Sequence, residues 1–459
     1  MNNYRPKYHF CSKDGWINDP NGFVYFNGKY HLFFQYQKGL DGSPMSWGHA
    51  ISDDLIFFEE LKPVICHDSA YDEAGSWSGS AIVYKDQLYL IYTGHRLIND
   101  KPFQTQNIVI SKDGIHFKKY SKNPVISDDL LPEGASIEDF RDPSLFSYRN
   151  RIYCLVGNRS KDDVSQLLLY KSKNVKKWTF ERTLINNKEL GYMLECPSSA
   201  KIENKRVLIL SPIGLKPRNN EYWNSANSIY IVADQALKNI DCFAHHEIDG
   251  GLDFYAAHVI SNGDIMISWM QNWGRSIQSI DEKQKWVNCF TLPRKLSLKN
   301  NKLIQQALPQ LEKHFTNEVV FNGYIKDEIE IEGMKGYFKH LHIEFSQGND
   351  FHIKLFKKGN NFVSVDYDKS LLTIDRRNSL HRVISYKEEL SSNNYRQLEI
   401  KSKKVILDIY LDRITLEVFV NGGKNVMSMV SYSDDDFDGI SFYSTTGKKV
   451  KIISKDFVD

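Results

Sequence analysis

Short apolar segments recur along the first 300 residues at nearly equal spacing. Most of them follow a polar turn, and each is a short apolar run of the length of a β-strand. Five such segments are residues 29–34, 87–92, 151–156, 206–210 and 264–269. Their first residues are separated by 58, 64, 55 and 58 positions. The spacing predicts five similar units, unless unrelated strands are evenly spaced by chance.

A second pattern recurs out of phase with the first. It comprises residues 52–57, 111–117 and 172–178, which are offset by 59 and 61 positions. Each reads as a polar turn that leads into an aromatic-bearing strand, so each unit contains several strands. Units of this length without long amphipathic helices indicate a β-propeller. We therefore expect a five-bladed β-propeller over residues 1–300.

The pattern changes after about residue 300. Residues 301–317 resemble a connecting segment, whereas strict alternation dominates from residue 318 onward, as at 340–345 and 414–420. Alternation with regular turns predicts a second all-β domain, a β-sandwich. The expected organisation is all-β: a propeller at 1–300, a linker at 301–317 and a sandwich at 318–459.

One polar residue occupies a similar position in each of the five units. These residues lie between 9 and 11 positions before the recurring strand, and they are Asp19, Ser78, Asp142, Glu195 and Asp253. The innermost strand of a propeller blade borders the central funnel. We therefore expect these side chains to converge on one site.

Three of these acids have unusual neighbours. Asp19 lies in a turn-forming run at 18–22, and Arg141 beside Asp142 should lower the pKa of that carboxyl. Apolar neighbours should raise the pKa of Glu195 and suit it to act as a general acid. Singly, each acid has a structural alternative: a turn, a half-exposed strand position or an ion pair. Together they form the carboxylate set that a glycosidase needs, with the third acid stabilising the substrate or the transition state.

The composition and the net charge argue against some classes of binding partner. The 59 basic and 57 acidic residues leave a formal charge of +2, which gives no footprint for nucleic acid or an anionic membrane. No apolar run is long enough to span a bilayer, and the N-terminus has no apolar signal region, so we expect a cytoplasmic protein. The six cysteines are scattered and predict reduced thiols. No spacing indicates a metal site, and no cofactor is expected.

Several motifs carry a family resemblance over nearly the whole chain. They lie at residues 15–22, 33–36, 47–50, 78–80, 140–143, 191–197, 253–256, 411–413 and 417–421. Together they resemble glycoside hydrolase family 32, which comprises invertases, sucrose-6-phosphate hydrolases and fructanases. Within them, Gly-Trp-Ile-Asn-Asp-Pro-Asn-Gly at 15–22 and the Arg-Asp-Pro and Glu-Cys motifs are the most specific.

The resemblance implies a propeller joined to a sandwich and a double-displacement reaction on β-fructofuranosides. Asp19 would be the nucleophile, Glu195 the acid and then the base, and Asp142 the stabiliser of the transition state. Arg141 would orient Glu195 or the sugar ring. The pocket for the terminal fructose would be lined by Asn18, Gln35, Trp47, Trp77 and Ser78.

Other residues in these motifs receive weaker interpretations. Trp16 fits core packing and pocket lining equally, whereas His49 is expected to be structural and Cys196 a small packing residue. Gln37 and Lys38 stand where many family members carry Asn-Pro, and Trp77 replaces a common phenylalanine. These departures concern the leaving group, because the positions lie near the pocket rim in the family.

The sequence leaves several activities open. The leading hypothesis is a retaining β-fructofuranosidase of the invertase type that hydrolyses sucrose, sucrose 6-phosphate or short fructo-oligosaccharides. The alternatives are a fructosyltransferase, an exo-acting fructanase that degrades levan or inulin, and a fructan-binding protein without activity. The intact Asp19, Asp142 and Glu195 argue against the last. The expected partner is a small sugar, and a homodimer through the sandwich is an expectation by analogy only.

Overall fold

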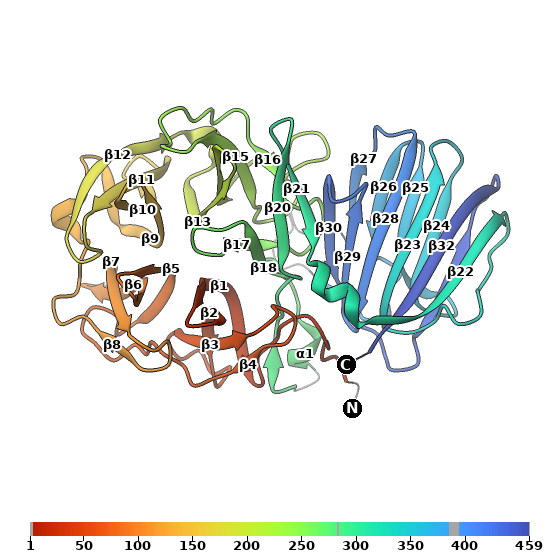
Figure 1. Ribbon diagram of the computed structural model, residues 1–459, viewed down its shortest axis with the longest axis horizontal. Coiled ribbons are helices and arrows are strands. Elements are labelled where there is room, and N and C mark those ends of the chain that lie inside the picture. Colours follow the sequence, from red (N-terminus) through yellow and green to blue (C-terminus); the bar gives the residue numbers. More distant parts are fainter. Residues whose placement is uncertain (1–2, 282–283, 385–393, 459) are drawn as a thin grey trace.

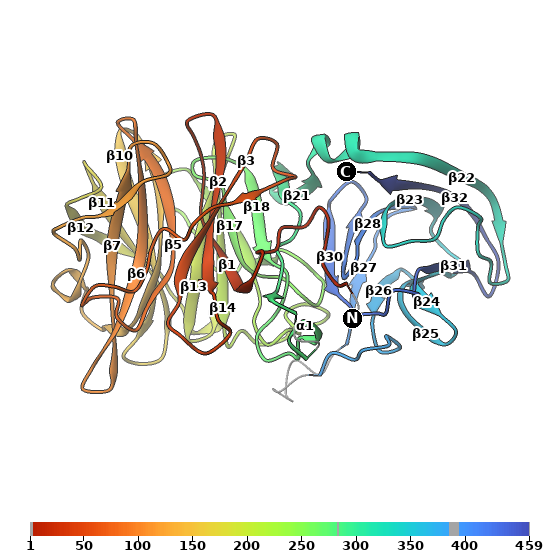
Figure 2. The same cartoon turned by 90° about the horizontal axis from the view of Figure 1, so that it is seen from below.

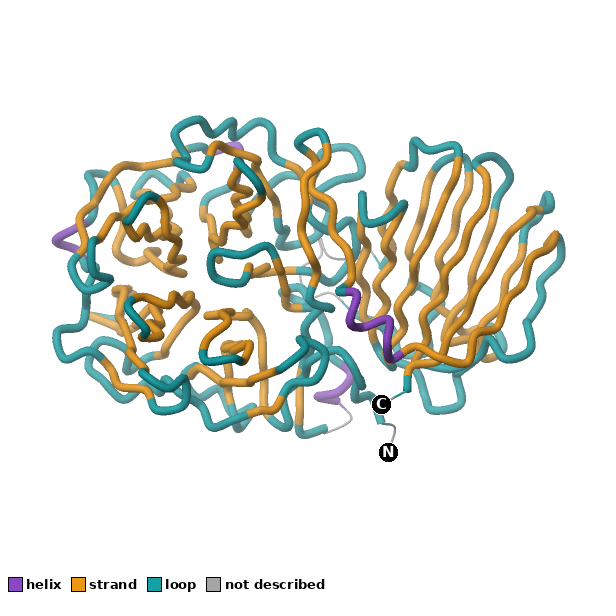
Figure 3. The backbone as a smooth tube through the Cα atoms, viewed as in Figure 1, coloured by secondary structure: helices purple, strands orange, loops and turns teal. Residues whose placement is uncertain are grey.

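The computed structural model describes residues 3–281, 284–384 and 394–458. Five sheets surround a common centre, and two further sheets stack face to face beside them (Figure 1). The prediction of an all-β chain with a five-bladed β-propeller and a C-terminal β-sandwich is confirmed. The described helices are short and lie in connections between strands (Figure 3): α1 (Gln278–Asp281), η1 (Asp128–Leu130), η2 (Lys188–Leu190) and η3 (Pro309–His314). No helix in these ranges is both long and apolar enough to cross a membrane.

The first three blades follow one another along the chain. The first consists of β1 (Gly15–Phe26), β2 (Lys29–Gln37), β3 (Ser46–Ser52) and β4 (Glu59–Glu60), with β19 (Trp286–Val287) parallel to β1. The second consists of β5 (Gly75–Tyr84), β6 (Gln87–Ile98), β7 (Lys101–Ser111) and β8 (Phe117–Lys119). The third consists of β9 (Ala135–Tyr148), β10 (Arg151–Ser160), β11 (Ser165–Ser172) and β12 (Trp178–Asn186).

The last two blades complete the ring. The fourth consists of β13 (Met193–Ile202), β14 (Lys205–Ile213), β15 (Ile229–Asp234) and β16 (His246–Glu247). The fifth consists of β17 (Tyr255–Val259), β18 (Ile265–Trp269), β20 (Arg294–Lys299) and β21 (Lys302–Ala307). The five recurring segments of the sequence coincide with the second strand of each blade, as expected.

The second sequence pattern is a repeated turn before the outermost strand. In the first blade, Oδ1 of Asp54 accepts hydrogen bonds from the backbone N–H groups of Ile56 and Phe57 at 2.8 and 3.0 Å. Asp113 and Asn174 make the same turn in the second and third blades. The side chain takes the place of a backbone acceptor, which explains why only Asp or Asn occupies this position.

The innermost strands β1, β5, β9, β13 and β17 share an irregularity that positions the site. Each contains a register shift against the second strand of its blade. An inserted residue bends the strand locally and re-aims neighbouring side chains. These bulges therefore turn side chains toward the propeller axis near the start of each innermost strand.

The sandwich consists of two antiparallel sheets. The first has the order β22 (Phe315–Ile325), β32 (Lys448–Phe457), β23 (Phe338–Ser346), β28 (Lys404–Asp412), β29 (Thr415–Val420) and β30 (Asn425–Val430). The second has the order β27 (Tyr395–Glu399), β26 (Leu371–Asp375), β25 (Asn361–Asp368), β24 (Phe351–Lys358) and β31 (Gly439–Tyr443). Alternate residues such as Leu341, Ile343, Ile353 and Val365 fill one core between the sheets.

The expected linker at 301–317 contains a propeller strand. β21 pairs with β20 along its whole length, and η3 connects it to β22, the first strand of the sandwich. We therefore propose that the domains meet at residues 308–314, a shorter stretch within the predicted linker, because β21 and the first residues of β22 take up its two ends.

Buried ion pairs fix the sandwich against the propeller, which lies beside it (Figure 2). Arg294 of β20 is fully buried and donates from Nε to Glu417 of β29 at 3.0 Å, while its Nη1 lies 3.0 Å from Asp249. Buried charges are tolerated only when they are paired and hydrogen-bonded. The pairing therefore specifies how the two domains dock.

Candidate active site

A cavity of about 620 Å³ opens near the starts of the innermost strands. Eight of the nine predicted site residues line it: Asn18, Asp19, Gln35, Trp77, Ser78, Arg141, Asp142 and Glu195. They come from β1, β2, β5, β9 and β13, so side chains far apart in sequence meet at one place. A cavity of this size suits a small ligand.

Trp47 is the predicted pocket residue that the structure places elsewhere. It is fully buried in the core of the propeller, where its ring packs against Phe33 and Tyr92. Its Nε1 donates a hydrogen bond of 3.0 Å to the carbonyl oxygen of Trp77. It lies on β3, one strand further from the axis than the lining residue Gln35, so it supports the cavity wall from behind and does not form it.

The bulges show which positions of the blades correspond. The last paired residue before the irregularity is Trp77 in β5, Arg141 in β9, Glu195 in β13 and Tyr255 in β17. The next residue has a positive φ in three blades, 64° at Asp142, 46° at Cys196 and 54° at Ala256. Glu195 therefore corresponds to Arg141 and Tyr255, and Cys196 corresponds to Asp142. Counting back from the second strand of each blade had aligned Glu195 with Asp142, which differs by one position from the alignment that the bulges give.

Asp19 lies at the centre of a hydrogen-bond network. Its Oδ2 accepts a bond of 2.6 Å from the Ser78 hydroxyl, and its Oδ1 accepts one of 3.0 Å from Nδ2 of Asn18. Sγ of Cys196 lies 3.4 Å from Oδ2. Burial raises the pKa of Asp19 to about 6, although these donors oppose the rise. The carboxylate is thus held in one orientation and is ionised near neutral pH.

Asp142 is buried more deeply than the sequence indicated. Its own N–H donates to Oγ1 of Thr93 at 2.9 Å, and its Oδ2 accepts a bond of 2.9 Å from the N–H of Cys196. Burial raises the pKa of Asp142 to about 7, and the nearby Arg141 only reduces that rise. The expectation of a lowered pKa is therefore wrong. Arg141 forms its ion pairs with Asp139 and Glu195 instead.

Glu195 is held from both sides. Nε and Nη2 of Arg141 donate to its Oε1 at 3.1 and 2.8 Å, and the Tyr255 hydroxyl donates to its Oε2 at 2.6 Å. Its surroundings are therefore polar and not the apolar setting that the sequence suggested. Sequence reasoning missed Tyr255, although it lies inside the motif at 253–256.

Asp253 does not belong to the cavity. It is fully buried and forms ion pairs with Arg275 and with Arg376, which follows β26 of the sandwich. The fifth member of the polar series is therefore a domain-joining carboxylate. The residue of the fifth blade that reaches the site is Tyr255, two positions later.

The cavity rim includes residues that the sequence did not single out as a group. They are Trp16, Gln37, Met45, Pro102, Gln104, Glu138, Asp139 and Trp273. Nε1 of Trp16 donates to Oδ1 of Asn18 at 3.1 Å, so Trp16 lines the cavity and orients a neighbour. The ring of Trp77 stacks on His95 with 4.0 Å between centroids. The tryptophans offer flat apolar faces beside polar groups, a combination that fits a sugar.

Two further residues of the motifs differ in how their surroundings agree with the sequence interpretation. His49 is buried and stacks on Phe33 with 4.4 Å between centroids, as expected of a structural residue. Cys196 is not a mere packing residue, because its Sγ lies 3.4 Å from Oδ2 of Asp19 and 3.6 Å from Oδ2 of Asp142. Its thiol thus separates two carboxylates.

The arrangement has the groups for cleavage of a glycosidic bond. Asp19 is a positioned carboxylate, and Glu195 is a second carboxyl held across the same cavity by Arg141 and Tyr255. Retaining glycosidases use such a pair as nucleophile and acid. Among the described residues, no group of three His, Cys, Asp or Glu side chains is arranged to hold a metal ion.

Comparisons with protein families match both domains. The model of the glycosyl hydrolases family 32 N-terminal domain matches residues 9–307, and that of the family 32 C-terminal domain matches residues 309–457. A sucrose-6-phosphate hydrolase of Zymomonas mobilis is 32% identical over 94% of this chain and 86% of its own length. A raffinose invertase of Escherichia coli is 30% identical over 98% of this chain and 94% of its own length.

Solved structures resemble the chain over almost its full length. Sucrose-6-phosphate hydrolase from Lactobacillus gasseri superposes with a TM-score of 0.87 at 27% identity, covering 99% of this chain and 93% of that one. A family 32 β-fructofuranosidase of Bombyx mori superposes with a TM-score of 0.82 at 28% identity, covering 99% and 94%. Both domains therefore have solved counterparts.

Proposed function

This chain belongs to glycosyl hydrolase family 32, and from that premise we propose that it is a retaining β-fructofuranosidase in which Asp19 is the nucleophile and Glu195 the acid and base. Its substrate is a β-fructofuranoside such as sucrose or sucrose 6-phosphate. Support for the substrate comes from the relatives, several of which are named sucrose-6-phosphate hydrolases.

In the first step Asp19 attacks the anomeric C2 of fructose. The C2–O bond to the leaving sugar breaks, and Glu195 gives its proton to the departing oxygen. The product is a fructosyl ester on Asp19. The hydrogen bond from Ser78 holds Oδ2 of Asp19. Oδ1 can therefore bond to C2 after its hydrogen bond from Asn18 breaks.

In the second step Glu195 acts as the base. It takes a proton from water, the water oxygen attacks C2, and the ester bond to Asp19 breaks, so the configuration at C2 is retained. Asp142 does not form a bond to substrate. Its buried carboxyl binds the ring hydroxyls and stabilises the positive charge that develops at C2.

The single observation that carries this proposal is the convergence of Asp19, Asp142 and Glu195 on one cavity through bulges of three innermost strands. Arg141 and Tyr255 are positioning residues, because each holds Glu195 by a hydrogen bond. The pocket for the terminal fructose is formed by Asn18, Gln35, Trp77 and Ser78, with Trp16 and Trp273 at the rim.

A substrate panel tests the proposal. Purified protein should release fructose from sucrose or sucrose 6-phosphate, and the Asp19→Ala variant should release at least about a hundredfold less in the same time. Kestose, inulin and levan extend the panel, and product ratios at high sucrose separate hydrolysis from fructosyl transfer. The proposal would be contradicted if the protein cleaved none of these fructosides. The homodimer and the cytoplasmic location stay predictions from sequence.

A further inference from the structure

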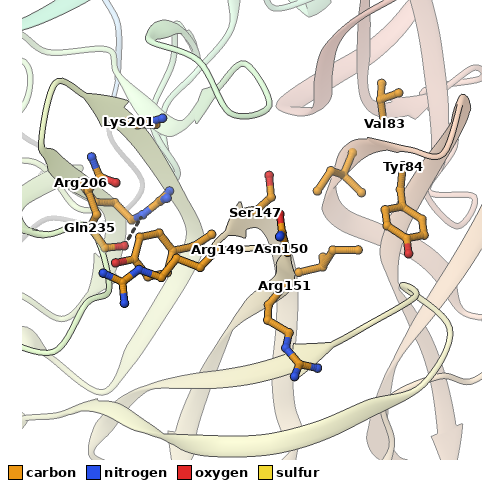
Figure 4. Close-up of a pocket in the computed structure, with 12 residues that line it drawn as sticks. Val83, Tyr84, Ser147, Arg149, Asn150, Arg151, Lys201, Arg206 and Gln235 are labelled. Atoms are coloured by element: carbon orange, nitrogen blue, oxygen red, sulfur yellow. Dashed lines mark hydrogen bonds between the residues drawn. The ribbon is translucent and has the colours of Figure 1, made fainter.

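A second cavity lies at the opposite ends of the innermost strands. Its volume is about 770 Å³, and it is formed by the far ends of β5, β9 and β13 with parts of β10 and β14. Lys201, Arg206 and Gln235 stand on one side, Val83 and Tyr84 stand on the other, and the turn at 149–150 lies between them (Figure 4). The volume is that of a small-molecule site.

The lining of this cavity is strongly basic. Four cations line it, Arg149, Arg151, Lys201 and Arg206, and no carboxylate does. Within the described part of the chain, none of the four forms an ion pair with an acid. The chain as a whole is nearly neutral, so this concentration of positive charge is local. A concave surface lined by one sign of charge attracts ions of the other sign.

Arg206 is the most unusual of the four because it is buried without a counter-ion. Six arginines in the described ranges are at most 5% exposed. Five of them pair with carboxylates, namely Arg275, Arg294, Arg376, Arg396 and Arg413. Arg206, at 1% exposed, is the exception. A buried charge without a partner is costly, and an anion in the cavity would remove that cost.

The contacts of Arg206 hold it in place without neutralising it. Nη1 donates to the Ser199 hydroxyl at 2.9 Å, and Nε donates to the backbone oxygen of Gln235 at 3.3 Å. Its guanidinium carbon lies 4.1 Å from the centre of the Phe146 ring. Burial lowers the pKa of Arg206 to about 10, and no carboxylate opposes this effect. The guanidinium therefore stays charged at neutral pH, and it lies in the wall of the cavity.

We propose that this cavity binds the phosphate group of a small phosphate monoester such as a sugar phosphate, through Arg206 together with Arg149 and Lys201. A guanidinium group can donate two parallel N–H hydrogen bonds to two oxygens of one phosphate, and a lysine ammonium group adds a compact positive charge. The polar side chains of Asn150 and Gln235 line the same cavity and can receive the hydroxyl groups of the ester.

The proposed site is distinct from the active site. Along β5, β9 and β13, five or six residues separate Ser78, Asp142 and Glu195 from the strand ends that line the cavity, which is roughly 16–20 Å of extended chain. A ligand there does not occupy the fructose pocket. The proposal is therefore independent of which fructoside the enzyme cleaves.

Calorimetric titration with glucose 6-phosphate tests the proposal, with fructose present in excess to fill the active site. Wild-type protein should bind one equivalent, inorganic phosphate should compete, and glucose should not. The Arg149→Asn/Lys201→Ser variant changes two exposed cations and should weaken binding by at least about tenfold, the effect of losing one charged hydrogen bond. Arg206→Gln should weaken it further if its melting curve shows that it is folded.

Matched controls make the outcome decisive. The Lys299→Ser/Lys403→Ser variant also removes two exposed positive charges, but at positions that do not line the cavity, and should bind as wild-type does. Asp19→Ala should also retain binding, which excludes the active site as the location. The proposal is overturned if glucose 6-phosphate does not bind, if both double variants bind it equally well, or if Asp19→Ala abolishes the binding.

Discussion

The hydroxyl of Ser78 donates a hydrogen bond of 2.6 Å to Oδ2 of Asp19. Ser78 lies on β5 and Asp19 on β1, so this bond connects neighbouring blades at the point where both innermost strands bulge. It stabilises the ionised form of Asp19 against the burial that raises the pKa of this carboxyl. The nucleophile therefore depends on a partner from another blade.

Replacement of Ser78 by alanine should raise the pKa of Asp19 above its value of about 6. A hydrogen bond to a charged group contributes about 1.5–3 kcal/mol, so kcat/KM for sucrose near neutral pH should fall by roughly tenfold or more. The acid limb of the pH profile should move to higher pH. Ser80→Ala is the control: Ser80 is buried on the same strand, and its hydroxyl oxygen accepts a hydrogen bond of 2.8 Å from the N–H of Leu145. An unmoved limb in Ser78→Ala would contradict the role of the bond.

The pH dependence of the wild-type enzyme follows from Asp19. The carboxylate must be ionised to attack C2, so kcat/KM should fall about tenfold per unit as the pH drops below about 6. Steady-state rates measured across pH 4–8 check this. A profile that stays flat down to pH 4 would be incompatible with Asp19 as the nucleophile.

The same pKa shift predicts a cost in stability. The folded chain holds the Asp19 proton up to about pH 6, whereas the ordinary value is 3.8, so the free energy of unfolding should rise as the pH falls through this window. Asp19→Asn removes the buried charge and should raise the melting temperature at pH 7. The difference in melting temperature between Asp19→Asn and wild-type should become smaller toward pH 4. A melting temperature of Asp19→Asn below that of wild-type at pH 7 would contradict the proposed destabilisation by the buried charge of Asp19.

The period of the sequence was enough to predict the propeller, because each blade repeats the same second strand and the first three blades repeat the same Asx turn. The site was harder to predict at single-residue resolution. Counting along the chain aligned Asp253 with Asp19, but bulges insert residues that a count cannot see, and they bring Tyr255 to Glu195 instead. Trp47 was misplaced for a similar reason, since a signature motif does not tell which strand of a blade it occupies.

Charge environments were the least predictable feature. Adjacency in sequence suggested that Arg141 lowers the pKa of Asp142, but burial of that carboxyl has the larger effect and raises its pKa. The guanidinium instead meets Glu195 of the next blade. The family resemblance had implied Glu195 or the sugar ring as the partner of Arg141, whereas the neighbouring residues in the sequence alone pointed to Asp142.

Replacement of Tyr255 by phenylalanine should lower kcat for sucrose with little change in KM. The hydroxyl fixes Oε2 of Glu195, and its loss leaves the acid held by Arg141 alone, so we expect a fall of roughly tenfold for one lost bond to a charged group. Initial rates over a range of sucrose concentrations separate the two constants. Tyr84→Phe is the control, because Tyr84 lies far from Glu195. A change confined to KM would argue against a positioning role.

Asp253→Ala should destabilise the protein without removing a catalytic group. Its loss leaves Arg275 and Arg376 buried without their carboxylate, which costs about 3–5 kcal/mol. Denaturant titration measures this cost, and the activity per folded molecule should stay close to wild-type at low temperature. A stable variant that has lost its activity would instead place Asp253 in the active site.

Capture of the fructosyl-enzyme tests the assignment of Asp19 most directly. In Glu195→Gln the acid and base are lost, but a fructosyl donor with a good leaving group, such as β-fructosyl fluoride, can still react in the first step while the second is slowed. Intact-protein mass spectrometry should then show one added fructosyl unit, and peptide mapping should place it on Asp19. An adduct on another residue, or none while fluoride is released as rapidly as by wild-type, would contradict the assignment.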